Sequence, residues 1–80
     1  MGNKVEDRIR DVMSAVFEIS ADQIDDYSSM DSIESWDSLR HMNLVIALEE
    51  EFDCEFYDSE TVEMLNFKLI RVILNDHGVS

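Results

Sequence analysis

Proline is absent from this chain of 80 residues, and glycine occurs only twice. Because these residues interrupt helices and mark turns, their scarcity favours helices joined by polar loops, and no alternating apolar run is long enough to predict a sheet. A chain of this length buries a limited share of its surface, so residues 1–80 are expected to form one domain at most. The apolar share of 45% is normal for a globular protein, so the chain is expected to fold.

Cysteine and long apolar runs are also scarce. Cys54 is the only cysteine, which excludes an internal disulfide and a multi-cysteine metal site and is typical of a reducing compartment. Two acidic residues flank Cys54 and no basic residue lies beside it, so a structural or incidental thiol is favoured over a redox thiol. No apolar run approaches the roughly 18 residues of a membrane span. These absences predict a cytoplasmic protein without a membrane span.

Basic residues number six against nineteen acidic residues, and the formal net charge is −13. Such a charge repels phosphate backbones and anionic lipid headgroups, and it attracts basic protein surfaces over long distances. Nucleic-acid binding is therefore disfavoured. The acidic loop around Asp22, Asp25 and Asp26 lacks the glycine that the sharp turn of an EF-hand calcium loop requires, so we expect a solvated loop and no metal site.

Apolar residues at helical spacing predict a first helix from about Lys4 to Glu18. These residues are Val5, Ile9, Val12, Met13, Val16 and Phe17. The segment 20–35 is rich in Asp and Ser and has no period, which predicts a long loop. Isolated apolar residues are expected to attach this loop to the core at intervals: Ile24, Tyr27, Met30 and Ile33. Long loops in compact domains are often functional.

A second helix is predicted from about Ser38 to Glu51, and its apolar residues are too many for one face. At about 100° per residue, one group falls within a single arc and forms a core stripe: Leu44, Val45, Leu48 and Phe52. A second group lies on nearly the opposite side, and we call it the apolar strip: Leu39, Met42 and Ile46. The same angular count puts Glu49 and Glu50 along its two borders.

The apolar strip has two interpretations. Its residues can pack under the preceding loop, which we expect for part of Leu39. Alternatively they form a partner-facing surface with a rim of carboxylates, in which apolar contacts provide affinity and charges provide steering. We favour the second interpretation for Met42 and Ile46.

The last third of the chain is predicted to be extended over 53–57, with Phe56 turned inward. A short helix is predicted from about Ser59 to Met64, with Asp58 or Ser59 as its N-cap. Asn66 is predicted to cap a last helix that ends at Gly78. Its core face is expected to consist of Phe67, Ile70, Ile73 and Leu74. The expected fold is all-α, a small four-helix bundle with three main helices, a short third helix and a long loop between helices one and two.

Ser38 opens the second helix within the stretch Glu-Ser-Trp-Asp-Ser-Leu at 34–39. Its hydroxyl can cap the helix by accepting a hydrogen bond from one of the first backbone N–H groups. It can equally be a chemical handle at a helix start that favours a bound phosphate. Trp36, two residues earlier, is interpreted as a loop anchor that packs onto the bundle.

Hydrolysis by Ser38 is disfavoured. His41 lies about one helical turn away, but an activated serine also needs an orienting group and an oxyanion hole, and no glycine-rich segment supplies the latter. The angular count puts His41 toward the core, where a hydrogen-bonded structural role is expected. His77, near the C-terminus, is expected to be idle. The chain is therefore predicted not to be an enzyme.

Asp37-Ser38-Leu39 is followed by the run LVIALEEEFD at 44–53. This combination resembles the signature of acyl carrier proteins, in which an Asp-Ser-Leu triplet opens helix two and an Ala-Leu-Glu-Glu-Glu-Phe run closes it. The triplet lies at the right distance from the acidic run. The resemblance extends from the first helix through the last and covers nearly the whole chain.

The resemblance implies that a phosphopantetheinyl transferase attaches the 4'-phosphopantetheine of coenzyme A to Ser38 through a phosphodiester. The thiol of that arm would carry an acyl group as a thioester. It further implies a non-catalytic carrier domain that serves as a substrate for other enzymes and is expected to be a monomer. Ser38 is then a handle at the cap position, with no conflict between the two roles in the unmodified protein.

The same resemblance implies recognition roles on helix two. Asp37 and Leu39 would help to present the serine to the transferase, and Met42 and Ile46 would contact partners. The expected partners are acyl-transferring and acyl-modifying enzymes with basic docking surfaces, which would meet Glu49 and Glu50. The core of such carriers also shelters acyl chains in some members.

Four residues around the triplet depart from the pattern of primary fatty-acid carriers: Trp36, Arg40, His41 and Asn43. With these residues, the start of helix two resembles that of free-standing carriers of specialised pathways. The predicted function therefore spans fatty-acid, polyketide, nonribosomal peptide or related specialised biosynthesis. The alternative function is an acidic helical interaction module. Such a module would use the apolar strip to bind a basic partner without a prosthetic group.

Overall fold

A computed structural model describes residues 4–78. Its elements are α1 (Lys4–Phe17), the short 3₁₀-helix η1 (Ala21–Gln23), α2 (Ser38–Phe52), α3 (Asp58–Thr61) and α4 (Phe67–Asp76). No strand occurs in these residues, where the pairing of Ser29 with Asn66 is an isolated β-bridge. The all-α bundle with a short third helix and a long loop between the first two is confirmed. Within 4–78, no helix is long and apolar enough to cross a membrane.

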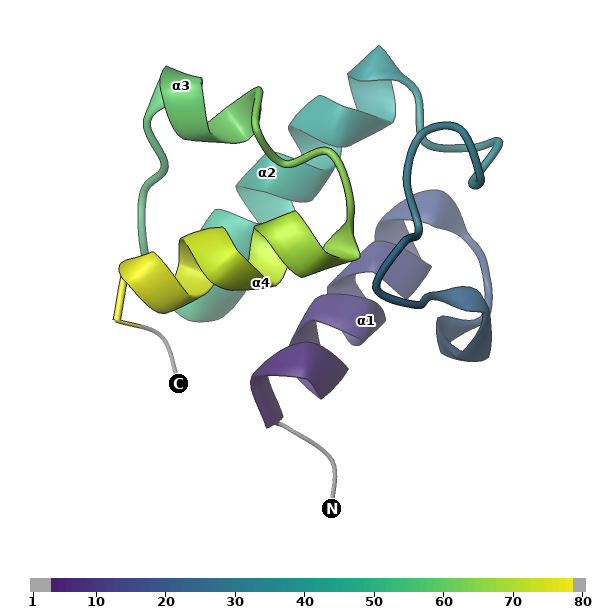
Figure 1. Cartoon of the computed structure of the whole chain (residues 1–80), viewed down its shortest axis with the longest axis horizontal. Coiled ribbons are helices and arrows are strands. Elements are labelled where there is room, and N and C mark those ends of the chain that lie inside the picture. Colours follow the sequence, from purple (N-terminus) through teal and green to yellow (C-terminus); the bar gives the residue numbers. More distant parts are fainter. Residues whose placement is uncertain (1–3, 79–80) are drawn as a thin grey trace.

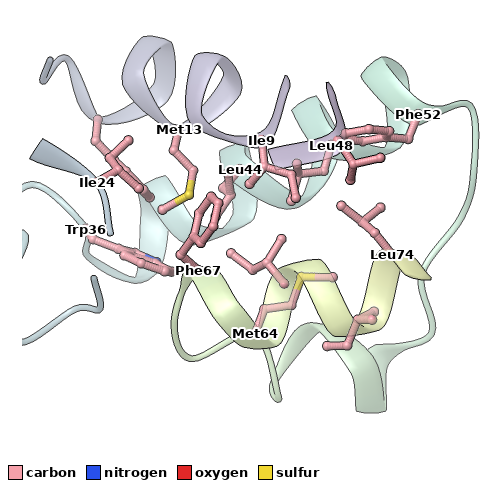
Figure 2. Close-up of a cluster of buried hydrophobic side chains, with 14 of the residues drawn as sticks. Ile9, Met13, Ile24, Trp36, Leu44, Leu48, Phe52, Met64, Phe67 and Leu74 are labelled. Atoms are coloured by element: carbon pink, nitrogen blue, oxygen red, sulfur yellow. The ribbon is translucent and has the colours of Figure 1, made fainter. Parts of the chain in front are cut away.

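The three main helices enclose one core, in which α1 contacts both α2 and α4. Figure 1 shows α3 on one side of these helices and the long loop 18–37 on the other side, beside α1. Figure 2 shows side chains from all three main helices pointing toward one another: Ile9, Met13, Leu44, Leu48, Phe67 and Leu74. These six side chains are completely buried. The core faces predicted for the three helices are thereby confirmed, with Val12, Val16 and Val45 half-buried at the edge.

Side chains cap α2 and α4 at their first turns. The Asp37 carboxylate accepts a hydrogen bond from the Arg40 N–H at 2.8 Å, and α2 begins at the next residue. The Asn66 side chain accepts from the Leu69 N–H at 2.8 Å, which confirms the predicted N-cap of α4. Beyond α4, Gly78 has a φ of +82°, a conformation that glycine adopts without steric cost and that ends a helix.

The short helix differs from its prediction. It begins at Asp58 instead of Ser59 and ends at Thr61 instead of Met64, so Tyr57 holds the N-cap position. Because the chain leaves the helical path after Thr61, Met64 turns into the core and becomes completely buried. The 3.6-residue period of apolar residues does not reveal such a turn, because the turn depends on the core that Met64 enters.

The long loop is attached to the bundle in a different way from the predicted one. Ile24 and Ile33 are buried as expected, but Tyr27 is 80% exposed and Met30 is 41% exposed. Between Tyr27 and Met30 the loop is attached to the bundle by a polar contact. The Phe67 N–H donates a hydrogen bond to the backbone carbonyl of the buried Ser28 at 3.1 Å. The prediction that all four apolar residues anchor the loop was therefore wrong for Tyr27 and Met30. Backbone pairing to the start of α4 takes their place.

Candidate functional site

Ser38 is the first residue of α2, and its side chain is exposed. Asp37 has an extended backbone (φ −107°, ψ −177°) and supplies the cap. An N-cap residue lies just outside the helix, whereas Ser38 already has helical geometry, so its hydroxyl is not the cap. The expectation that Ser38 occupies the cap position was wrong. The hydroxyl stands at the exposed start of the helix beside a carboxylate that performs the capping.

The segment before Ser38 is held firmly against the end of α1. Trp36 is only 2% exposed, and its indole stacks on Phe17 with the ring centroids 4.9 Å apart. The Ser35 hydroxyl donates a hydrogen bond to the Phe17 carbonyl at 2.8 Å. The interpretation of Trp36 as an anchor is confirmed. Consequently the start of α2, with Ser38 upon it, has a defined position relative to α1.

His41 lies about one helical turn after Ser38 on α2, and its ring makes two hydrogen bonds. Its Nδ1 is 3.0 Å from the Trp36 indole nitrogen, and its Nε2 is 2.8 Å from the Thr61 carbonyl oxygen. The predicted structural role of this histidine is confirmed. Both ring nitrogens are engaged away from Ser38, so the ring does not serve as a base for that hydroxyl.

Arg40 also turns inward. Its guanidinium donates to the Val16 carbonyl at 2.7 Å and lies 3.3 Å from the Glu18 carboxylate. It therefore joins the start of α2 to the end of α1 and neutralises an acid there. Of the four residues that depart from the pattern of fatty-acid carriers, only Asn43 is exposed. The other three satisfy contacts within the chain, so they do not describe the surface that a partner meets.

The apolar strip is exposed along its whole length. The exposed fractions are 70% for Leu39, 64% for Met42 and 53% for Ile46. The expectation that Leu39 packs partly under the preceding loop was wrong, because Trp36 and Ser35 draw that loop toward α1. Surface apolar residues grouped in this way mark interaction sites more often than residues scattered singly.

Two further exposed apolar residues lie beyond α3. Val62 is 70% exposed and Leu65 is 59% exposed. Val62 directly follows Thr61, whose carbonyl binds His41 of α2, so this corner of the molecule borders the first half of α2. Sequence reasoning missed both residues, because it extended α3 to Met64 and assigned no surface to the linker.

The two carboxylates of the predicted rim differ. Glu49 is half-buried, and its Oε2 accepts the Phe56 N–H at 2.9 Å. Glu50 is exposed. Glu49 thus binds the connection between α2 and α3 and has a structural role that the angular count did not reveal. Glu50 remains as the rim carboxylate that is open to solvent.

His77, expected to be idle, is engaged in the contact that joins α4 to α3. Its Nε2 lies 2.9 Å from both carboxylate oxygens of Glu60, and its ring meets the Phe56 ring edge-on at 5.2 Å. The Tyr57 N–H and the His77 ring both donate to the Glu60 carboxylate, and they hold its pKa below the ordinary value. The expectation failed because folding returns the C-terminal end of α4 to α3.

Cys54 is half-buried at the end of α2. Burial raises the pKa of its thiol, and the carboxylates of Glu49, Asp53 and Glu60 raise it further. Because the thiolate is the nucleophile, this environment favours the unreactive neutral form. Among residues 4–78, no group of three or more His, Cys, Asp and Glu side chains is arranged to hold a metal ion.

The described residues thus form a small helical bundle that exposes a serine at the start of a main helix, beside an apolar strip. No protein-family model matches the chain. It is 39% identical over 64 residues to the acyl carrier protein of Buchnera aphidicola subsp. Schizaphis graminum (strain Sg), and the alignment covers 80% of each chain. The chain belongs to the acyl carrier protein family, whose members are non-catalytic carriers.

Proposed function

We propose that Ser38 is the attachment site of 4'-phosphopantetheine and that the protein carries acyl groups as thioesters on this arm. In this proposal the described residues act as one carrier domain. The observation that carries it is the placement of the Ser38 hydroxyl, which is exposed at the first position of α2 while Asp37 performs the capping.

The residues at the start of α2 suit a phosphodiester. The first N–H groups of a helix have no partner within the helix, and the positive end of the helix dipole favours negative charge. Asp37 accepts the Arg40 N–H alone, at 2.8 Å, so its capping occupies only part of this donor set. When bound, the arm supplies a terminal thiol, the group that forms the thioester.

The loading reaction uses Ser38 as the nucleophile. Its Oγ forms a bond to the coenzyme A phosphorus that bears the pantetheine, and the bond from this phosphorus to the bridging pyrophosphate oxygen breaks. Adenosine 3',5'-bisphosphate leaves, and the hydroxyl proton passes to a base of the transferase. Both ring nitrogens of His41 are engaged elsewhere, at Trp36 and Thr61, so this chain's nearest histidine does not take the proton.

Partner recognition is assigned to the exposed face of α2. Asp37 and Leu39 flank the serine and would be read by the phosphopantetheinyl transferase. Met42 and Ile46 would contact acyl-transferring and acyl-modifying enzymes, and Glu50 would meet a basic residue on their docking surfaces. Glu49 would contribute mainly by holding the connection to α3.

Intact-mass measurement tests the attachment directly. The protein is incubated with coenzyme A, Mg²⁺ and a broad-specificity phosphopantetheinyl transferase, and the mass is compared before and after. We expect the wild type to gain one phosphopantetheine. The Ser38→Ala control should gain none, and Ser59→Ala, which removes an exposed hydroxyl from α3, should be loaded like the wild type.

An unchanged wild-type mass, or an equal gain on Ser38→Ala, would refute the attachment. The apolar strip would then favour an acidic interaction module that binds a basic partner protein without a prosthetic group. Loss of partner binding on changing Met42 and Ile46 to Ser, in a chain that cannot be loaded, would support that function.

A further inference from the structure

α3 is held in place without a buried side chain of its own. None of its four residues, Asp58–Thr61, is buried. It is attached from two sides by the two histidines of the chain: His77, which directly follows α4, binds the Glu60 carboxylate, and His41 of α2 binds the Thr61 carbonyl. Apolar packing holds the chain on either side of α3, at Phe56 and Met64, whereas the two histidine contacts of α3 itself are polar and respond to proton binding.

The partners of His41 determine where its proton lies. An indole N–H only donates, so the Nδ1 that faces Trp36 must be an acceptor without a proton. A backbone carbonyl only accepts, so the Nε2 that faces Thr61 must carry the proton. Both bonds exist together only in the neutral ring with its proton on Nε2. A second proton would set the Nδ1–H against the indole N–H and break the bond to Trp36.

These contacts form a continuous chain across the site. The Phe17 ring at the end of α1 stacks on Trp36, Trp36 binds His41, and His41 binds α3. The indole and imidazole planes are 16° apart, an angle that is compatible with a hydrogen bond in the plane of both rings. Trp36 lies two residues before Ser38, so these contacts reach the segment that presents the exposed hydroxyl.

We propose that His41 is a positioning residue that joins α3 to the segment presenting Ser38, and that it does so only as the neutral ring protonated on Nε2. In this arrangement the exposed corner of Val62 and Leu65 keeps a constant position relative to the serine. Protonation of the ring releases the two parts from each other. The link to Ser38 loading rests on the proposed function, whereas the link between Trp36 and α3 does not.

Other charged groups on the elements around the ring are already engaged or exposed. They are Glu18, Asp37, Arg40, Asp58 and Glu60. Arg40 pairs with Glu18, the Asp37 carboxylate caps α2, and Glu60 pairs with His77. Asp58 is exposed. The response to acid at Trp36 is therefore assigned to His41, whose partner there is a neutral indole.

The structural test uses the unmodified chain. Trp36 is the only tryptophan, so its emission reports this contact alone, and amide hydrogen exchange at residues 60–62 reports α3. Exchange is expressed as protection factors, because free amide exchange itself slows as the pH falls. Between about pH 8 and pH 5, where histidine changes charge, we expect the Trp36 emission to change with one midpoint, while the protection factors of residues 60–62 stay constant, because the charged ring still donates from Nε2 to the Thr61 carbonyl. Removing the bond to Thr61 by substitution should instead lower those protection factors about fivefold, the effect of losing one ordinary hydrogen bond.

Two variants separate the two hydrogen bonds of the His41 ring, and a third variant is the control. His41→Asn keeps an acceptor at the Nδ1 position and should free α3 while the Trp36 emission stays near that of the wild type. His41→Gln keeps a donor at the Nε2 position and should do the reverse. Neither should show the transition. His77→Gln removes the other titratable ring that holds α3, and it should leave the Trp36 midpoint unchanged.

The link to Ser38 is tested by loading kinetics with the transferase. His41→Asn and His41→Gln should each lower kcat/KM for loading about fivefold, because each breaks one of the two bonds that join α3 to the Trp36 segment, while His77→Gln should stay near the wild type. Equal loading of all four chains would overturn the link to Ser38 and leave the carrier function intact. A wild type that is not loaded at all would overturn the carrier function, and the fluorescence result would still stand.

Equal effects of His41→Asn and His41→Gln on both signals would show that the ring only fills space. A Trp36 transition that persists in both His41 variants, or that disappears in His77→Gln, would likewise overturn the role assigned to His41.

Discussion

α4 and α3 are held to the bundle by different forces. α4 buries four apolar side chains, Phe67, Ile70, Ile73 and Leu74, whereas α3 buries none. Burial of one such side chain contributes about 1.5–3 kcal/mol, and a net hydrogen bond contributes about 0.5–1.5 kcal/mol. The core of α1, α2 and α4 therefore carries the stability. We expect the α3 side, which contacts α2 at His41, one helical turn from Ser38, to open at lower cost.

Truncation in the core should have the largest effect. Ile70→Ala removes a completely buried side chain of α4 and should lower the free energy of unfolding by about 3 kcal/mol through lost burial and a cavity. Val72→Ala, on the 44%-exposed side of the same helix, should cost less than about 1 kcal/mol. Urea unfolding measures both. Equal losses would mean that the stability is not concentrated in the core.

The start of α2 should show a smaller and asymmetric effect. Asp37→Ala removes the cap and should cost about 1 kcal/mol. Ser38→Ala should change the free energy of unfolding by less than about 0.5 kcal/mol, because the Ser38 side chain is exposed and is not the cap. A Ser38→Ala loss as large as that of Asp37→Ala, measured by the same urea titration, would return the capping role to the serine.

The contact between His77, at the end of α4, and Glu60 of α3 should make the stability of the fold depend on pH. Because the folded protein lowers the pKa of Glu60, this carboxylate stabilises the fold above its unfolded pKa of about 4.3, and the contribution is lost as the pH falls through the lower folded value. Tm measured from pH 7 down to pH 3 should show the wild type above Glu60→Gln at neutral pH. The difference should close in acid. A constant difference over this range would contradict the assignment.

The two acids of the rim should separate function from stability, with the smallest effect on folding. Glu50→Lys should leave the free energy of unfolding within about 0.5 kcal/mol of the wild type. It should slow acyl transfer to a partner enzyme and weaken the salt dependence of that transfer. Glu49→Lys should in addition destabilise the chain, since Phe56 loses its acceptor. Unchanged transfer rates and salt slope in Glu50→Lys would reduce the rim to a solubility feature.

Much of the fold follows from local pattern. The 3.6-residue period predicted all three main helices and their buried faces, and the Asn66 amide before an apolar run predicted the cap of α4. The same pattern predicted the exposure of Met42 and Ile46, because two opposite arcs on one helix cannot both face a single core.

The candidate site was predictable in position but not in its chemical details. The Asp-Ser-Leu triplet located the exposed serine at the start of α2. Sequence reasoning nevertheless gave the serine the cap position, because Asp, Ser and Thr are all good caps and the choice depends on which residue has the extended backbone. That backbone follows from Trp36, which is drawn against Phe17 from a helix 19 residues earlier.

By itself, the sequence determined the helices, the core stripes, the membership of a small acidic all-α class and the position of the serine. Only the tertiary structure decided what the polar side chains do: Arg40 at the end of α1, His41 between Trp36 and α3, Glu49 at Phe56, and His77 at Glu60. The physical reason is range. Apolar periodicity is a local property of one helix, whereas several of these hydrogen bonds join residues 17–24 positions apart, which meet only after the core has formed.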